Sequence, residues 1–129
     1  MIDKSKMEQA ASLFEQCSPL FMALGDNVRQ KLIMFLMESG FEGINVGNLA
    51  SKTHLSRPAV SHHLKILKDA GVITLVKKGT ESFYHICLGE KLPAFQKLIF
   101  QIDSIIAELN EEEKKMLFNG IEQKTITGC

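Results

Sequence analysis

The chain has 129 residues, of which 45% are hydrophobic, and this is enough apolar material for one compact domain with a core. This composition excludes a disordered chain, and no segment approaches the roughly 18 unbroken apolar residues of a membrane span. The formal net charge is zero, yet residues 51–88 hold six basic residues against two acidic ones. We therefore expect one basic surface that meets a polyanion, between mildly acidic flanks.

The three cysteines, Cys17, Cys87 and Cys129, lie far apart, with no C-x-x-C pair and no disulfide framework. This usage is typical of proteins in a reducing cytoplasm. No long apolar run follows the charged residues near the N-terminus, so we expect a cytoplasmic protein that does not associate with a membrane.

The first helical pattern covers residues 4–24, where apolar residues recur every three or four positions. Pro19 lies inside it and predicts a break or restart, because a mid-helix proline removes a hydrogen bond and clashes with the preceding turn. Asp26 is expected to cap a second helix, which Gly40 ends. The segment FEGIN, residues 41–45, is interpreted as a connector.

Two short helices are predicted next. Asn45 is expected to cap the first, over VGNLASKT, and a tight turn follows at His54. Ser56 is expected to cap the second, which has a proline in its first turn and is closed by Gly71. Two short helices joined in this way predict a helix-turn-helix.

The second of these helices divides into two faces when about 100° is assigned to each residue. One arc is polar and holds Arg57, Pro58, Ser61, His62, Lys65, Lys68 and Asp69. The opposite arc is apolar except for His63, which we interpret as a hydrogen-bonded histidine that ties the helix to its neighbours. Because His62 and His63 point in directions about 100° apart, they are a weak indication of a metal site.

The polar arc has the chemistry needed to read DNA in the major groove, namely donors for guanine edges and phosphates and hydroxyls that adapt. An ordinary solvated helix face is the alternative interpretation. Directly afterwards, VITLVK and SFYHIC are rich in β-branched and aromatic residues and flank a polar turn, which predicts a hairpin. Lys77 and Lys78 lie at its tip, as in a wing that reaches phosphates or the minor groove. A hairpin that only packs on the core is again the alternative.

Residues 21–86, about half of the chain, carry four successive motifs: LGDNVRQKLI, VGNLA, SRPAVSHHLKILKDAG and a wing that ends in YHI. In order and spacing they resemble the ArsR/SmtB family of bacterial winged-helix transcriptional repressors. The resemblance implies a mainly α fold with a small β-hairpin, a winged helix-turn-helix with extra N- and C-terminal dimerisation helices. It also implies a homodimer that binds double-stranded DNA at a palindromic operator and releases it when an inducer binds.

One domain is expected over residues 1–129. Its predicted parts are the helix-turn-helix (about 45–70), the wing (72–88), the dimerisation helices (4–24 and 90–119) and a tail (120–129). From Leu92 onward apolar residues recur at a spacing near 3.5, and with one face of the first helix they predict a two-fold interface. Its residues are Phe14, Cys17, Phe95, Leu98, Ile99, Ile102, Ile105, Ile106 and Leu109. Folding back of this stripe onto the chain's own core is the alternative.

The residues predicted to contact DNA are Ser56, Arg57, Pro58, Ala59, Ser61, His62, Lys65, Lys77 and Lys78. The metal ligands of the family are missing. Asn45 and Gly47 stand where arsenic, lead and cadmium sensors carry the two cysteines of a C-x-C motif. Where zinc sensors have D-x-H, this chain has Asp103 and, in place of the histidine, Ile105. We therefore predict no cofactor and no metal site of a known pattern.

The inducer is unknown from the sequence. Cys17 and Cys87 are candidate redox sensors, although a free cysteine is more often a small buried hydrophobe. A metabolite bound between subunits, or no ligand at all, are the alternatives. No phosphate loop, nucleophile elbow or paired acidic motif indicates an enzyme. A protein-interaction module that uses the C-terminal amphipathic helix is the alternative of another class.

Overall fold

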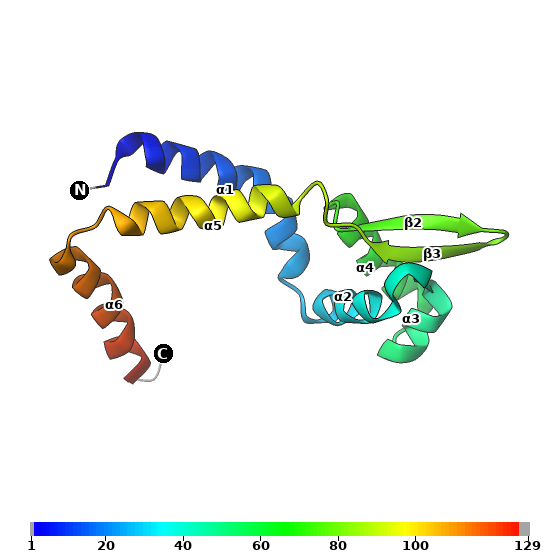
Figure 1. Cartoon of the computed structure of the whole chain (residues 1–129). Helices are drawn as coiled ribbons and strands as arrows, with labels where there is room; N and C mark the ends of the chain where they lie inside the picture. Colours follow the sequence, from blue (N-terminus) through cyan, green and yellow to red (C-terminus); the bar gives the residue numbers. More distant parts are fainter. Residues whose placement is uncertain (1, 127–129) are drawn as a thin grey trace. The chain divides into compact units, whose positions relative to one another are not determined.

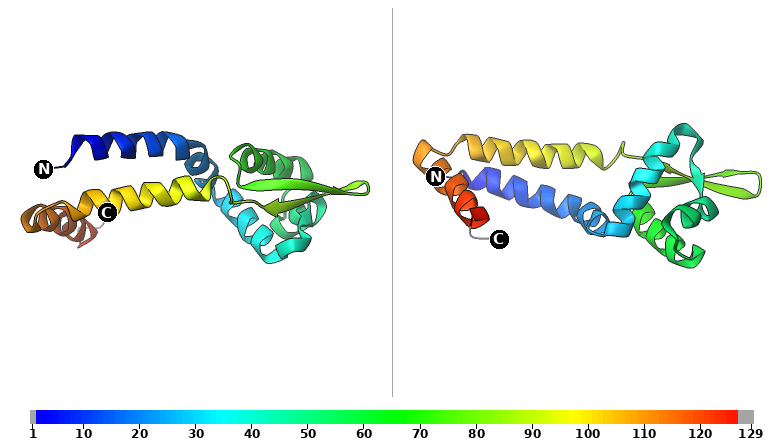
Figure 2. Two further views of the ribbon diagram at one scale, coloured as in Figure 1. Left: turned by 45° about the horizontal axis from the view of Figure 1, so that its top comes forward. Right: turned by 90° about the horizontal axis from the view of Figure 1, so that it is seen from below.

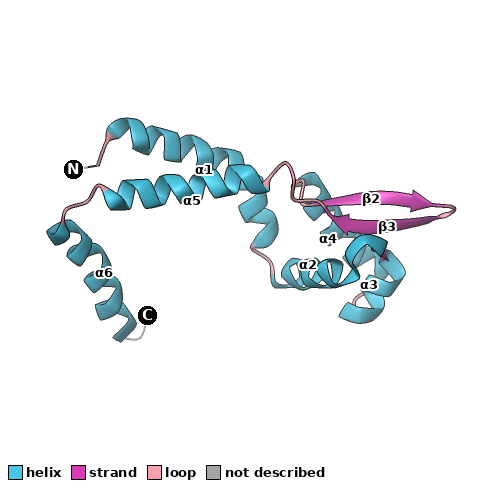
Figure 3. Cartoon of the chain, in the orientation of Figure 1, coloured by secondary structure: helices cyan, strands magenta, loops and turns pink. Residues whose placement is uncertain are grey.

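The computed structural model describes the backbone of residues 2–126 and the side-chain environment of residues 2–119. The helices are α1 (Lys4–Leu24), α2 (Asn27–Ser39), a short 3-10 helix η1 (Gly40–Glu42), α3 (Val46–Thr53), α4 (Arg57–Asp69), α5 (Leu92–Ala107) and α6 (Glu111–Ile126) (Figure 1). The strands are β1 (Ile44–Asn45), β2 (Ile73–Lys78) and β3 (Glu81–Ile86) (Figure 3). The expected mainly α fold with a small β-hairpin is thereby confirmed.

The chain divides into two compact units. One unit holds residues 16–94 and therefore contains α2, α3, α4 and the hairpin. The other joins the first 15 residues to those from Phe95 onward. Among the described residues, no helix has the length and apolar character needed to cross a membrane.

Pro19 does not break α1, which continues to Leu24, so the predicted interruption is wrong. A proline costs a helix one hydrogen bond, but packing can hold the helical path where its neighbours are buried. Cys17, Leu20 and Ala23, which surround the proline in sequence, are all buried. The burial of this face explains why the helix persists.

The caps predicted from the sequence are present. Asp26 accepts a hydrogen bond from the backbone N–H of Arg29 at 3.0 Å, and Gly40 ends α2 in a positive-φ conformation (φ 56°). Asn45 accepts from the N–H of Asn48 at 2.8 Å at the start of α3. Since each cap satisfies an otherwise free N–H group, the helix starts are defined by local chemistry.

The segment 41–45 is more than a connector, and in this respect the prediction is wrong. Its last two residues form β1, which pairs antiparallel with β3, so the sheet has the order β1-β3-β2. Gly43 precedes β1 with φ 72°, and a Cβ there would lie 2.6 Å from the ring of His85. Glycine is therefore needed both for the backbone conformation and for the close approach of the two strands.

The core of residues 16–94 is made by one face of each of α2, α3 and α4. Its largest fully buried side chains are Leu32, Leu36, Leu49, Val60, Leu64, Leu67 and Val72. Burial of three of these on α4 alone fixes which side of that helix remains outside. The polar arc of α4 is thus presented outward by the packing of the opposite arc.

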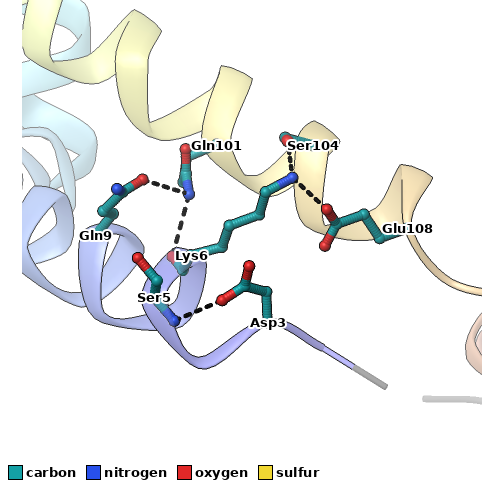
Figure 4. Close-up of polar contacts among 7 residues, drawn as sticks. All are labelled: Asp3, Ser5, Lys6, Gln9, Gln101, Ser104 and Glu108. Atoms are coloured by element: carbon teal, nitrogen blue, oxygen red, sulfur yellow. Dashed lines mark hydrogen bonds and ion pairs between the residues drawn. The ribbon is translucent and has the colours of Figure 1, made fainter.

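In the second unit, the first turns of α1 lie along α5 (Figure 2). Lys6 links the two helices, because its ammonium donates to Ser104 Oγ at 2.9 Å and pairs with Glu108 (Figure 4). Gln101 adds two bonds from its amide nitrogen, to the carbonyl of Lys6 and to Gln9 Oε1, each at 3.1 Å. These contacts fix the register of α1 against α5.

After α5, Asn110 starts α6 with a reciprocal cap. Its Oδ1 accepts from the N–H of Glu113, and its own N–H donates to Glu113 Oε1. The helix continues to Ile126, through most of the segment predicted as a tail. Residues 127–129, including Cys129, lie outside the described residues.

Replacing Asp26 with Ala should lower the urea midpoint of unfolding at pH 7, because the N–H of Arg29 loses its acceptor. This bond holds the pKa of the Asp26 carboxyl below its ordinary value of 3.8. The folded-state pKa is depressed, so the stabilisation is present above pH 3.8 and is lost as pH falls through the folded value.

Asp26→Ser is the matched control, since a neutral hydroxyl caps without titrating. It should retain most of the midpoint at pH 7 and show no acid-dependent loss from this position. Equal midpoints for wild type and Asp26→Ala at pH 7 would show that the cap does not stabilise α2.

Candidate nucleic-acid interface

The start of α4 is built by a tight turn and a side-chain cap. His54 adopts the left-handed conformation (φ 59°, ψ 23°) at the end of α3. Ser56 then accepts from the N–H of Ala59 at 3.2 Å, and Pro58 lies in the first turn as the sequence predicts. The helix ends at Asp69, with Ala70 as its C-cap and Gly71 at φ 81° directly after the cap.

The residues of α4 that were predicted to contact DNA lie on its outer side. Ser56, Arg57, Pro58, Ser61, His62 and Lys65 are exposed and Ala59 is half-buried. Hydroxyl, imidazole, ammonium and guanidinium groups therefore share one solvent-facing surface, which offers hydrogen-bond donors and positive charge together. Chemically, this surface can bind phosphates and the edges of bases.

The two adjacent histidines have different environments. His62 is exposed, whereas His63 is half-buried with its Nδ1 3.3 Å from Arg29 Nη1. A guanidinium can only donate, so Nδ1 of His63 must be the acceptor. Arg29 also donates to the carbonyls of Ala23 and Met22, and His63 thus ties α4 to α2 and the end of α1 as predicted.

No three His, Cys, Asp or Glu side chains within the described part of the chain are grouped so that they could hold a metal ion. The rings of His62 and His63 are 5.9 Å apart between centroids and tilted by 60°. His63 uses Nδ1 on Arg29. The two histidines therefore do not act as a pair: His63 contacts Arg29, and His62 is exposed to solvent.

The wing is the hairpin of β2 and β3, with Lys77 paired to Ser82 and Lys78 to Glu81 in register. Both lysines are exposed, but they face opposite sides because side chains alternate along a strand. Lys78 lies 5.2 Å from the centroid of the Phe83 ring and donates to the carbonyl of Glu42 at 3.5 Å. Its ammonium is therefore held against its own unit.

A pocket of about 390 Å³ lies where the start of α3 and the start of α4 meet the wing. It is lined by Asn45, Val46, Gly47, Arg57, Thr80, Glu81, Ser82 and Tyr84. Of these only Arg57 was singled out from the sequence as a DNA contact. Gly47 belongs to the VGNLA motif, but no pattern in the sequence relates it, Thr80 or Ser82 to Arg57, and it is the fold that brings them together.

The candidate redox cysteines differ in access. Cys17 is 3% exposed, whereas Cys87 is exposed. His85 is two residues from Cys87, but its Nε2 is buried and its ring packs against Gly43. Access therefore favours Cys87 over Cys17 for any reaction with an oxidant.

The residues predicted for the dimer interface fall into three groups. Cys17, Leu98 and Ile105 are buried within one chain. Phe14 and Ile99 are exposed, and Phe95, Ile102, Ile106 and Leu109 are half-buried. Phe100, which the 3.5-residue spacing did not include, is 73% exposed. The first three already contribute to the core of the chain, and the surface available to a second subunit comes from the others.

Comparison with known proteins identifies the family. The model of the family described as bacterial regulatory protein, arsR family, matches residues 26–74. An uncharacterized HTH-type transcriptional regulator of Methanocaldococcus jannaschii is 32% identical over 89 residues, which cover 69% of this chain and 97% of that protein. The chain belongs to the ArsR family. This ArsR-family protein is thus a DNA-binding transcriptional regulator with a winged helix-turn-helix.

Other relatives agree with this assignment. The transcriptional repressor SdpR of Bacillus subtilis is 37% identical to the ArsR-family chain over 67 residues, or 52% of this chain and 71% of SdpR. An ArsR-like transcriptional regulator from Rhodococcus sp. RHA1 shares its fold, with a TM-score of 0.62 at 24% identity, over 91% of this chain and 96% of that one. A homodimeric winged helix-turn-helix domain from Mycobacterium bovis also shares it, with a TM-score of 0.56 at 22% identity, over 72% and 83%. These relatives are described as regulators rather than enzymes.

The two wing lysines should contribute unequally to DNA binding. We expect Lys77→Ala to reduce the slope of log affinity against log salt by about one, as for the loss of one phosphate contact. Lys78→Ala should change the slope less, because this ammonium is held by Phe83 and Glu42. Fluorescence anisotropy with one duplex at several salt concentrations measures both. A larger effect of Lys78→Ala would show that its contacts open on DNA.

Proposed function

We propose that this ArsR-family protein is a homodimeric repressor, located in the cytoplasm, that binds a palindromic operator. The observation that carries the proposal is the exposed polar face of α4, which packing and capping hold in one orientation next to a basic hairpin. A helix with this face, at the second position of a helix-turn-helix, fits the major groove.

Ser61 and His62 are the proposed base readers. Both are exposed on the second turn of α4, one turn beyond the cap. A hydroxyl donates and accepts, and an imidazole offers two nitrogens, so both can pair with base edges. Lys65 and Lys77 supply positive charge that attracts the phosphates on either side of the groove.

The proposed dimer uses apolar residues of α1 and α5. Ile99 and Phe100 are neighbouring exposed apolar side chains on α5, and an exposed apolar patch is a typical protein–protein contact. A two-fold axis at this surface would pair two recognition helices with half-sites about 34 Å apart. The related Mycobacterium bovis domain, described as homodimeric, supports the same assembly.

The signal that releases DNA is proposed to differ from the metals sensed by known patterns of the family. Asn45 uses its side-chain oxygen to cap α3, and Gly47 has no side chain, so neither position supplies a thiolate. A metabolite or an oxidant is the proposed alternative. The exposure of Cys87 favours it as the reactive thiol.

Selection of binding sites from random duplex DNA tests the proposal. The protein is used reduced in a chelator and again after oxidation, with a Cys129→Ser variant as the control for the terminal thiol. A palindrome enriched in both samples supports a metal-independent dimeric regulator, and enrichment only in the reduced sample supports a thiol switch. No enrichment at low salt would overturn DNA reading and favour a protein-interaction module.

Ser61→Ala and His62→Ala should each lower the preference for the selected operator over random duplex by about 1–3 kcal/mol. The reason is the loss of a donor or acceptor at a base edge, while the phosphate contacts remain. Ser51→Ala changes an exposed serine of α3 outside this face and is the matched control. If the two α4 variants kept the full operator preference, the base-reading assignment would be wrong.

Ile99→Glu should shift the protein from dimer to monomer in sedimentation analysis and weaken operator binding, because a charge would be placed at an apolar contact. Ser51→Glu adds the same charge at an exposed position of α3, leaves α5 unchanged and should remain dimeric. A dimer that tolerates Ile99→Glu would show that α5 does not form the interface through this residue.

A further inference from the structure

The chain has two arginines, and their side chains have different contacts. Arg29 is engaged within the protein: its guanidinium donates to the carbonyls of Ala23 and Met22 and contacts His63. Arg57 has no hydrogen bond or ion pair within the described residues. Its donors are therefore available to a ligand.

The guanidinium of Arg57 lies beside Gly47 of α3. A Cβ built on Gly47 would lie 2.8 Å from its Nη2, 3.3 Å from Cζ and 3.6 Å from Nε. The guanidinium thus occupies the space that a side chain at position 47 would fill. Gly47 does not have a positive φ, so its backbone does not call for glycine, and an alanine there would have to move the end of the Arg57 side chain.

The guanidinium faces the 390 Å³ pocket between α3, α4 and the wing. Thr80 and Ser82 bring hydroxyl groups to the wall formed by the hairpin. Asn45 uses its oxygen on the N–H of Asn48, which leaves its amide nitrogen as a donor. Glu81 is the acidic residue of the lining, and it is exposed and paired in register with Lys78.

We propose that this pocket binds a phosphate of the DNA backbone and that Arg57 is a positioning residue, not a reader of bases. A planar guanidinium suits the paired oxygens of a phosphate. Its direction supports this role, because it reaches back to α3 and the wing rather than forward along the face of Ser61 and His62. The proposal rests on the proposed DNA-binding function and assigns Arg57, one of the predicted DNA contacts, to the phosphate backbone.

The test compares wild type, Arg57→Ala, Gly47→Ala and the double variant, with affinity for operator and for random duplex measured over a range of salt. Arg57→Ala should weaken both duplexes by a similar factor, about tenfold as is typical of a charge-assisted contact, and reduce the salt slope by about one. The ratio of operator to random affinity should stay unchanged.

Gly47→Ala displaces the guanidinium while keeping its charge in the protein. It should also weaken both duplexes, and it should have no further effect in the Arg57→Ala background, because the two changes act through one contact. Alanine favours a helix over glycine, so unfolding of α3 would not explain a loss, and a melting curve verifies this.

A collapse of the operator-to-random ratio in Arg57→Ala with an unchanged salt slope would overturn the proposal and make Arg57 a base reader. Wild-type affinity with an unchanged salt slope in Arg57→Ala would overturn it as well. Absence of any duplex binding by the wild-type protein would instead remove the proposed function itself, so the two failures are distinguishable.

Discussion

Burial of the apolar side of α4 is the constraint on which the proposed interface depends. Val60, Leu64 and Leu67 are fully buried, and each such side chain contributes about 1.5–3 kcal/mol of transfer free energy. Turning α4 by one residue, about 100°, would expose them and bury charged groups in their place. The orientation of the polar face is therefore enforced by the core, without any contribution from a ligand. If this face binds DNA as proposed, it does so already in its final direction, which lowers the ordering cost of binding.

Side-chain caps define where the helices of this unit begin. Asp26, Asn45 and Ser56 each accept from the N–H three residues later, at the starts of α2, α3 and α4. A side-chain acceptor at these positions fixes the helix start to within a residue. For α4 this matters beyond stability, since a shift of the start would change which side chains occupy its first two turns.

The features that were predictable from the sequence are local ones. Helical period predicts the two arcs of α4 and the different environments of its two histidines. Capping rules predict its start at Ser56. The persistence of α1 through Pro19 was not predictable, because it depends on the tertiary burial of neighbouring residues. The strand β1 was not predicted, because a strand of two residues is too short to show an alternation of apolar and polar residues. The approach of Arg57 to Gly47 joins residues of different helices through space, and no spacing in the sequence encodes it.

Gly47 also has a consequence for the variation of this protein among its relatives. A larger residue there would contact the end of the Arg57 side chain, whereas the backbone of Gly47 has no positive φ that calls for glycine. The two positions should accordingly vary together: where residue 57 becomes short, residue 47 is released to become alanine or larger, and α3 gains helix propensity. An alignment would then show paired substitutions at positions 47 and 57, which belong to separate helices. A glycine at position 47 would accompany a long side chain at position 57.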